Sequence, residues 1–442
     1  MTSSITERLL LSFRGESLKA RLVRGALGVG GLKLFYLPLT LITSILLARG
    51  LGPAGYGQYS FVMAVISLLA LPVGSGLGQL VTREVAKYHH SEEWGLFRGL
   101  LERAHQWIIL GSAILAGAIA LVAARNASWV VDDRWTLLLL ATLLLPLLGL
   151  NALRSATLRG LRNVFYAQLP EMSARPGLHL VIVGGLLALG MLNPATALVS
   201  QILATGLAFA LGAWFLIRLK PAELGHARPE YSHHEWGRAL LPFTMLAAVG
   251  TLNGQIGILA LGWLGTDEDI AALRVAMSGA MLVMLSLSIV NMVIGPHITR
   301  AHRDNDTSQL QRLSRQSARA ALAAGLPIAL LLIFIGGPIV ELLYGKDYRD
   351  TATWPLAILA LGQLINVAFG SVGLFLSMCG HERDTLAGQI IALLVNGIAA
   401  VFLIPPLGAV GAALSVAIGL TTWNIVLAIR FVQRLGFRPS AF

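Results

Sequence analysis

Residues 25–48 read GALGVGGLKLFYLPLTLITSILLA and contain one charged side chain, Lys33. A transmembrane α-helix needs about 20 mostly apolar residues to cross the hydrocarbon core of a bilayer. This stretch is long enough to cross. It is too long for the apolar region of a secretory signal peptide, which holds about 7 to 15 residues. We therefore interpret it as a transmembrane helix.

Similar apolar runs recur along the whole chain, each bounded by charges or by Gly and Pro. They lie at about 58–80, 104–124, 135–157, 169–191, 195–217, 239–264, 271–296, 318–342, 353–378, 385–404 and 408–429. Apolar types make up 56% of the 442 residues and charged types 12%, against about 25% in an ordinary globular protein. The sequence predicts an all-α polytopic membrane protein with about 12 transmembrane helices.

The two halves of the chain are similar at corresponding places. RGAL at 24–27 corresponds to RALL at 238–241, and VTR at 81–83 corresponds to ITR at 298–300. Six helices per half preserve orientation, so we expect two lobes related by a pseudo-twofold axis along the membrane normal, a plan that places the substrate site between the lobes. The expected regions are an interfacial or cytoplasmic amphipathic segment at 1–24, an N-terminal six-helix lobe at 25–218, a cytoplasmic linker at 219–238, a C-terminal six-helix lobe at 239–432 and a cytoplasmic tail at 433–442.

The basic residues are unequally shared between alternate connections. The formal net charge is +11, but 25 Lys and Arg residues fall in the terminal segments, connections and adjoining helix ends of one side and five in those of the other. Cytoplasmic loops of membrane proteins carry such an excess. We therefore place both termini in the cytoplasm and attribute the charge to topology, not to nucleic-acid binding.

The sequence contains no signature of a cofactor or metal site. Cys379 is the only cysteine, which excludes an intramolecular disulfide and a cysteine metal cage. The Gly-rich run GALGVGGLK at 25–33 lacks the Gly-Lys-Ser/Thr of a phosphate-binding loop. We expect neither a cofactor nor a metal, and the short connections leave no room for a separate catalytic domain.

The predicted helix at 169–191 and its approach carry most of the candidate site. Gln168, Glu171, Arg175 and His179 are spaced by 3, 4 and 4 residues, which places them on one helix face. Ionisable side chains at membrane depth are expensive and usually face a bundle interior or a wet cavity. The alternative is an i, i+4 ion pair between Glu171 and Arg175 near the cytoplasmic end, with the arginine reaching the headgroups.

Other polar residues in the predicted helices extend this set. The further candidates for a lumen are Lys33, Arg154, Arg274, Asn253 and Gln255. Only Glu171 is an acidic residue deep in a predicted helix, so the lumen would be cationic and suited to an anion. A cation 4 Å from a phosphate gains about 4 kcal/mol at an effective dielectric near 20. With His179, Glu171 is also a candidate for coupling to protons.

One part of the sequence resembles a known family. The string LLARGLGPAGYGQY at 46–59, GLG at 76–78 and TREVA at 82–86 resemble the opening of polysaccharide-biosynthesis membrane proteins. These are lipid-linked oligosaccharide flippases of the multidrug/oligosaccharidyl-lipid/polysaccharide exporter superfamily. The matching motif is confined to about 24–90, with a fainter repeat at 238–303.

The resemblance implies transport of an undecaprenyl-diphosphate-linked oligosaccharide, such as an O-antigen, capsule or exopolysaccharide repeat unit. It implies movement from the cytoplasmic to the periplasmic leaflet of the bacterial inner membrane, by alternating access through the lumen. Partners would be that lipid, membrane lipids, and a polymerase or other polysaccharide-assembly proteins. The placement of Lys33, Arg154, Arg175 and Arg274 in the lumen rests on their positions in the predicted helices.

Other function classes fit the composition less well. An ion-coupled multidrug extruder of the same superfamily would favour carboxylates in the first lobe, where this chain has Lys33. A polymerase or ligase would show a long periplasmic loop with catalytic Arg or His, whereas the longest predicted one has about ten residues. A scaffold without transport is a third alternative.

Overall fold

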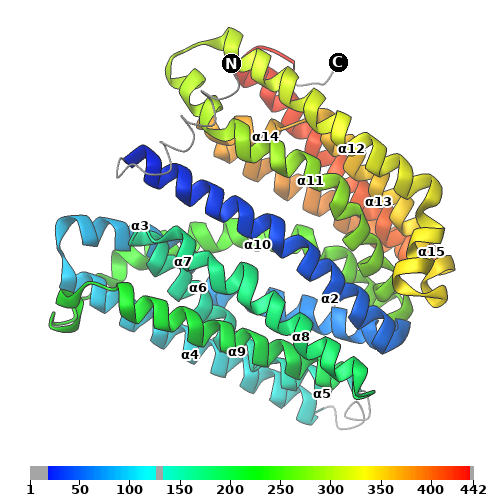
Figure 1. The fold of residues 1–442 in the computed structure, drawn as a ribbon, viewed down its shortest axis with the longest axis horizontal. Helices are drawn as coiled ribbons and strands as arrows, with labels where there is room; N and C mark the ends of the chain where they lie inside the picture. Colours follow the sequence, from blue (N-terminus) through cyan, green and yellow to red (C-terminus); the bar gives the residue numbers. More distant parts are fainter. Residues whose placement is uncertain (1–17, 126–132, 439–442) are drawn as a thin grey trace, which may run out of the picture. The chain divides into compact units, whose positions relative to one another are not determined.

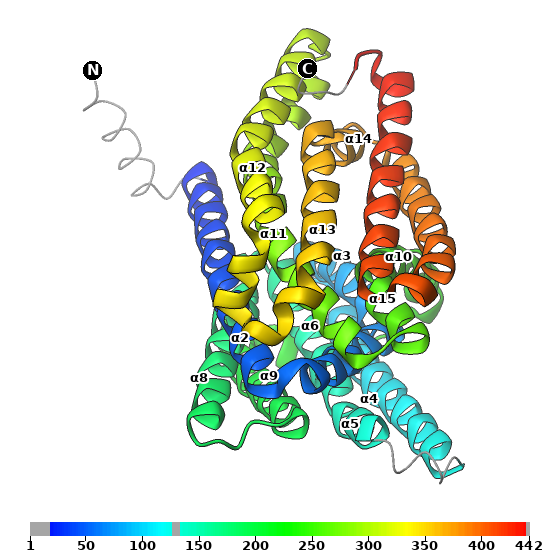
Figure 2. The ribbon, with the colours of Figure 1, turned by 90° about the vertical axis from the view of Figure 1, so that its right-hand side faces the viewer.

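The computed structural model describes residues 18–125 and 133–438, which form helices and no strands (Figures 1 and 2). The first part of the chain forms α2 (Leu18–Leu69), η1 (Leu71–Ser75), α3 (Gly76–Ser91), α4 (Trp94–Arg125), α5 (Asp133–Ala141), α6 (Leu144–Gly160), α7 (Val164–Leu169), η3 (Pro170–Ala174), α8 (Arg175–Ala188) and α9 (Pro194–Leu219). It continues with η4 (Ala222–Gly225), α10 (His233–Leu264), α11 (Asp267–Arg303), α12 (Thr307–Tyr344), η5 (Lys346–Tyr348), α13 (Arg349–Phe369), α14 (Val372–Met378) and α15 (Glu382–Leu435).

The two longest helices are each broken at one glycine. At 1.5 Å per residue, the 52 residues of α2 would measure about 78 Å if straight, more than twice the hydrocarbon core of about 30 Å. Gly52 interrupts α2 with a φ of 67°, and Gly408 interrupts α15 with a φ of 53°. Glycine alone adopts positive φ without steric cost. Each helix therefore consists of two rods. Gly52 lies between two predicted spans, and Gly408 is the first residue of the span predicted at 408–429.

Nine stretches of the described residues are helical, long and apolar enough to cross a membrane. The stretches at 31–91 and 382–435 are 61 and 54 residues long and contain the two glycine breaks. The predicted all-α polytopic fold is confirmed. A count of 12 crossings stays a prediction.

The structure divides into two compact units. Among the described residues, the first comprises 18–43, 69–125, 133–189 and 198–245, and the second comprises 44–68, 190–197 and 246–438. Two long helices, α2 and α10, contribute to both units. The division into lobes at 25–218 and 239–432 stays a proposal.

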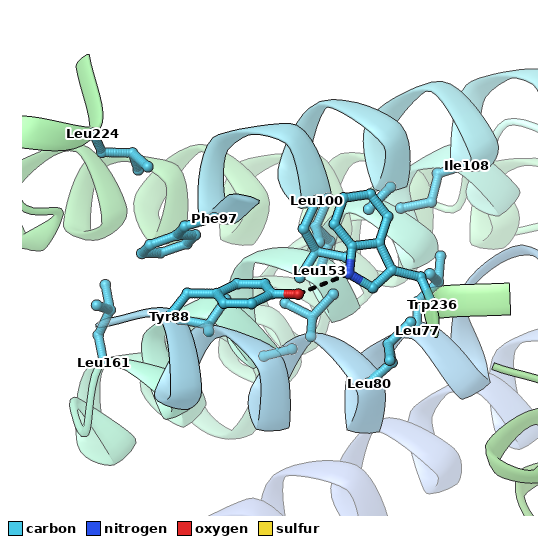
Figure 3. Packing of buried hydrophobic residues seen from close by; sticks show 14 of the residues in the cluster. Leu77, Leu80, Tyr88, Phe97, Leu100, Ile108, Leu153, Leu161, Leu224 and Trp236 are labelled. Carbon is cyan, nitrogen blue, oxygen red and sulfur yellow. Dashed lines mark hydrogen bonds between the residues drawn. The ribbon is translucent and has the colours of Figure 1, made fainter. Parts of the chain in front are cut away.

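In the first unit, α3, α4 and α6 pack around a buried apolar cluster (Figure 3). Tyr88 and Phe97 are fully buried in it, and the indole Nε1 of Trp236 donates a hydrogen bond of 2.9 Å to the hydroxyl of Tyr88. The start of α10 is thereby fixed to the core of the first unit.

In the second unit, α11, α12, α13 and α15 pack side by side (Figure 2). Thr266 starts α11 as an N-cap, because its hydroxyl accepts a bond from the Asp269 amide while the Asp269 carboxylate accepts one from the Thr266 amide. The same carboxylate accepts a 2.9 Å bond from the amide of Ala409. Asp269 therefore also holds the break in α15, next to Gly408.

One predicted span and the two predicted terminal regions need comment. The span predicted at 353–378 is interrupted, since α13 ends at Phe369 and Gly370 has a φ of 75° before α14 begins. Apolar content alone does not report such a turn. Residues 1–17 of the expected amphipathic segment lie outside the described residues, and α15 continues into the expected tail as far as Leu435.

Candidate functional site

The candidate site is built on an irregular helix in the first unit. Between α7 and α8 the chain forms a π-turn, η3, in which the amide of Arg175 bonds to the carbonyl of Pro170, five residues earlier. Pro170 and Pro176 have no N–H and cannot continue the ordinary α-helical bonding, which favours a local change of pitch. Single π-turns of this kind are frequent at functional sites.

Glu171 lies between two arginines. Its Oε2 is 3.3 Å from Nη1 of Arg175, and its Oε1 is 3.6 Å from Nη2 of Arg154, which comes from α6. The Arg154 side chain is 2% exposed, and those of Glu171 and Arg175 are 26% and 24% exposed. The arrangement leaves one positive charge in excess, partly shielded from solvent.

The guanidinium of Arg154 is enclosed by its own helix, α6, and by the neighbouring helix α9. Its Nη2 donates to Oδ1 of Asn151 at 3.2 Å, and Nδ2 of Asn151 donates to the carbonyl of Thr205 in α9 at 3.4 Å. A Cβ atom on Gly212 of α9 would overlap the guanidinium, so only glycine leaves room for it there. The Nε and Nη1 of Arg154 have no hydrogen-bond partner among the described residues.

Two further polar side chains on the same segment also lack partners. His179 is 7% exposed, and its Nε2 makes no hydrogen bond within residues 18–125 and 133–438. The buried Oε1 of Gln168 makes none there either. Buried polar atoms are nearly always bonded in native structures, and the exceptions need an explanation. These donors and acceptors lie beside a cluster with one positive charge in excess, a chemistry that suits a polar, anionic ligand.

The structure thus brings five of the predicted residues to α6 and the α7–η3–α8 segment, namely Gln168, Glu171, Arg175, His179 and Arg154. The structure contains the Glu171–Arg175 ion pair of the alternative interpretation. That interpretation is incomplete, because Arg154 of α6 also pairs with the Glu171 carboxylate.

The other four predicted residues have separate surroundings. Lys33 is exposed on α2 and makes no hydrogen bond or ion pair with the described residues. Arg274 and Gln255 are half-buried in the second unit, and Oε1 of Gln255 has no partner in the described part of the chain. Asn253, also in that unit, donates to the carbonyl of Gln389 at 3.1 Å. Gln255 lies two residues after Asn253, and such positions do not share a helix face.

The sequence did not identify two contributors to the cluster. Thr205 participates through its backbone carbonyl and Gly212 through its missing side chain. Every residue has a backbone carbonyl, and the chain contains 47 glycines. The sequence alone therefore does not single out either position. Asn151 precedes Arg154 by three residues, about one helical turn. Its link to α9 needed the structure.

Metal ligation is not a feature of the described part of the chain. No group of three or more His, Cys, Asp or Glu side chains there could hold a metal ion. What the cluster can do is bind an anion through its two arginines, in competition with Glu171.

A comparison with models of known protein families identifies the family of this chain. The family model described as "Polysaccharide biosynthesis protein" matches residues 46–353, more than half of the chain. The chain belongs to this family. The resemblance drawn from the motif at 46–59 is confirmed, and with its apolar helices this polysaccharide biosynthesis protein is a multi-pass membrane protein.

Two relatives of this family member have described roles. It is 21% identical over 390 residues to a probable low-salt glycan biosynthesis flippase, Agl15, of Haloferax volcanii, covering 87% of this chain and 78% of the relative. It is 23% identical over 178 residues to the capsular polysaccharide biosynthesis protein CapF of Staphylococcus aureus, covering 40% of this chain and 45% of CapF.

Solved structures show the fold of this family member. An inward-facing multidrug resistance MATE family transporter of the MOP superfamily matches with a TM-score of 0.74 at 15% identity, covering 90% of this chain and 94% of that one. The lipid II flippase MurJ, in an inward closed conformation, matches with a TM-score of 0.70 at 14% identity, covering 91% and 86%. The protein therefore shares the fold of these two solved structures.

Proposed function

We propose that this protein is a non-enzymatic flippase for an oligosaccharide linked to a polyprenyl diphosphate. The observation that carries the proposal is the partly buried Arg154–Glu171–Arg175 cluster in a member of the polysaccharide biosynthesis family. The printed role of Agl15 as a probable glycan biosynthesis flippase supports it.

The proposed substrate needs a protein to cross the membrane. In the hydrocarbon core its hydroxyls lose water at several kcal/mol per unsatisfied group, and its diphosphate loses far more. A wet, cationic passage open to the bilayer would solvate the headgroup while the polyprenyl chain stays in lipid. Arg154 and Arg175 supply N–H donors in the planar geometry that binds phosphate oxygens well.

In the proposed mechanism Glu171 holds the two arginines in place until the diphosphate displaces it. Transport then requires two conformations with different affinities for the substrate, which is alternating access. Glu171 is also the proposed coupling group, since a protonated carboxyl would release both arginines. Lys33, Arg274, Asn253 and Gln255 are proposed as further substrate contacts.

The proposed location is the bacterial inner membrane, with both termini in the cytoplasm. The distribution of Lys and Arg supports that orientation, because 25 of them lie on one side and five on the other. A polysaccharide polymerase and other assembly proteins are the proposed protein partners.

An extruder of organic cations is the second candidate, and the fold shared with MATE transporters favours it. The charge of the cluster opposes it, because a cation near Glu171 would meet two arginines that already neutralise the carboxylate.

Transport by the purified full-length protein in proteoliposomes separates these functions. We expect movement of a fluorescent undecaprenyl-diphosphate oligosaccharide between leaflets and no export of ethidium. Export of ethidium without movement of the lipid would replace the flippase with an extruder.

A further inference from the structure

A hollow of about 500 Å³ lies in the second unit, apart from the arginine cluster of the first. Its walls come from α2, the C-terminal end of α12 and the turn η5. The volume is within the range of about 300 to 1,000 Å³ of small-molecule sites. The lining includes Arg49, Glu341, Leu342, Lys346 and Asp347.

Hydrogen bonds fix the shape of this hollow. The Nε of Arg49 donates to the carbonyl of Leu343 at 2.8 Å, and its Nη2 donates to the carbonyl of Leu342. The hydroxyl of Tyr348 donates to the carbonyl of Ala48 at 3.0 Å. These bonds tie α2, just before its break at Gly52, to the end of α12 and to η5.

The hollow is lined by positively and negatively charged side chains that do not form ion pairs with each other. Lys346 and Asp347 are exposed and form no ion pair with the described residues. Arg49 has a further nitrogen, Nη1, without a bond to the described residues. Glu341 is bound to Arg349. A free ammonium and a free carboxylate on adjacent residues suit a ligand that itself carries both charges.

The position of the hollow indicates a lipid. It is at the ends of predicted spans on the side opposite the basic connections, which is the depth of the headgroups of the other leaflet. Leu342 lines it and is 74% exposed, an apolar surface suited to acyl chains. An anionic headgroup would be repelled by Asp347, and a cationic one by Lys346 and Arg49.

We propose that this hollow binds the headgroup of phosphatidylethanolamine. The phosphate lies near Lys346 and Nη1 of Arg49, the ammonium donates to Asp347, and the acyl chains leave along Leu342. The primary ammonium has N–H donors, which distinguishes this lipid from phosphatidylcholine. The bound lipid braces the break of α2 against α12.

Native mass spectrometry of the full-length protein in detergent tests this proposal. The protein is titrated with phosphatidylethanolamine, phosphatidylcholine and phosphatidylglycerol of identical acyl chains. We expect phosphatidylethanolamine to bind at least fivefold more tightly than the other two. Asp347→Ala should abolish that preference, and Lys346→Ala should weaken the binding of both phosphatidylethanolamine and phosphatidylglycerol.

Asp350→Ala is the matched control, since Asp350 is an exposed acidic residue nearby that does not line the hollow. It should retain the preference. Asp347→Asn keeps the size of the side chain and replaces Asp347→Ala if the alanine variant does not fold. Equal binding of phosphatidylethanolamine and phosphatidylglycerol, the absence of binding, or equal behaviour of the Asp347 and Asp350 variants would overturn the proposal.

Discussion

Replacing Glu171 by glutamine removes the only carboxylate that neutralises Arg154 and Arg175 in the cluster. The substitution keeps the size of the side chain and leaves Arg154, at 2% exposed, as a buried and uncompensated charge. We expect Glu171→Gln to destabilise the protein, and the substitution Arg154→Met to relieve much of that loss.

The magnitude follows from the distances. At 3.6 Å and 3.3 Å each attraction is about 5 kcal/mol at an effective dielectric near 20, and about 1 kcal/mol in bulk water. Breaking a buried pair costs about 3 to 5 kcal/mol. The side chains of Glu171 and Arg175 are about one quarter exposed, and screening by solvent lowers this cost. We therefore expect the free energy of unfolding to fall by about 2 to 4 kcal/mol. Replacement of a buried ion pair by apolar side chains is often neutral.

The assay is a double-mutant cycle in unfolding free energy, measured by reversible denaturation in mixed micelles. The four proteins are the unaltered chain, Glu171→Gln, Arg154→Met and the double variant. The double variant should be more stable than Glu171→Gln alone, with a coupling of at least about 1 kcal/mol. Effects that add within about 0.5 kcal/mol would refute the ion pair.

Three other substitutions test the surrounding structure by the same denaturation measurement. Gly212→Ala should lower the free energy of unfolding by about 1 to 3 kcal/mol, because its Cβ overlaps the guanidinium of Arg154. Arg154→Met should restore stability in the double variant. A loss of stability that Arg154→Met does not relieve would contradict the overlap. Gly408→Ala should lower the free energy of unfolding by about 1 to 3 kcal/mol, since φ is 53° and the new Cβ would lie 2.5 Å from Oδ1 of Asp269. An unchanged stability would contradict a rigid break at this position. Trp236→Phe should cost about 1 kcal/mol through the lost indole hydrogen bond, and no loss would mean that this bond contributes nothing to stability.

The helices were largely predictable from sequence because crossing a bilayer requires long apolar runs. The run at 25–48 lies within α2, and the run at 195–217 lies within α9. The helix ends were less predictable, since polar turns extend the helices beyond the apolar core: α12 begins at Thr307, well before the apolar run at 318–342. The turn at Gly370 was missed, because it changes φ without changing hydropathy.

The candidate site was predictable only along one helix. Spacing along the chain brings Glu171 to Arg175, and it carries no information about a third residue from α6. The pairing of Arg154 with Glu171 depends on helix packing and on Gly212, which leaves the space. The π-turn at 170–174 was also hidden, because prolines can bend membrane helices in several ways.

Movement of the diphosphate lipid tests the central role of the arginine cluster most directly. The measurement is the rate of translocation in proteoliposomes at equal protein content for the unaltered chain, Arg175→Ala, Arg175→Lys and Arg303→Ala. Arg303 is the matched control, because it is 78% exposed and lies at the end of α11. We predict at least a tenfold loss for Arg175→Ala, partial activity for Arg175→Lys and no change for Arg303→Ala. An unchanged rate in Arg175→Ala would contradict a cluster that binds the diphosphate.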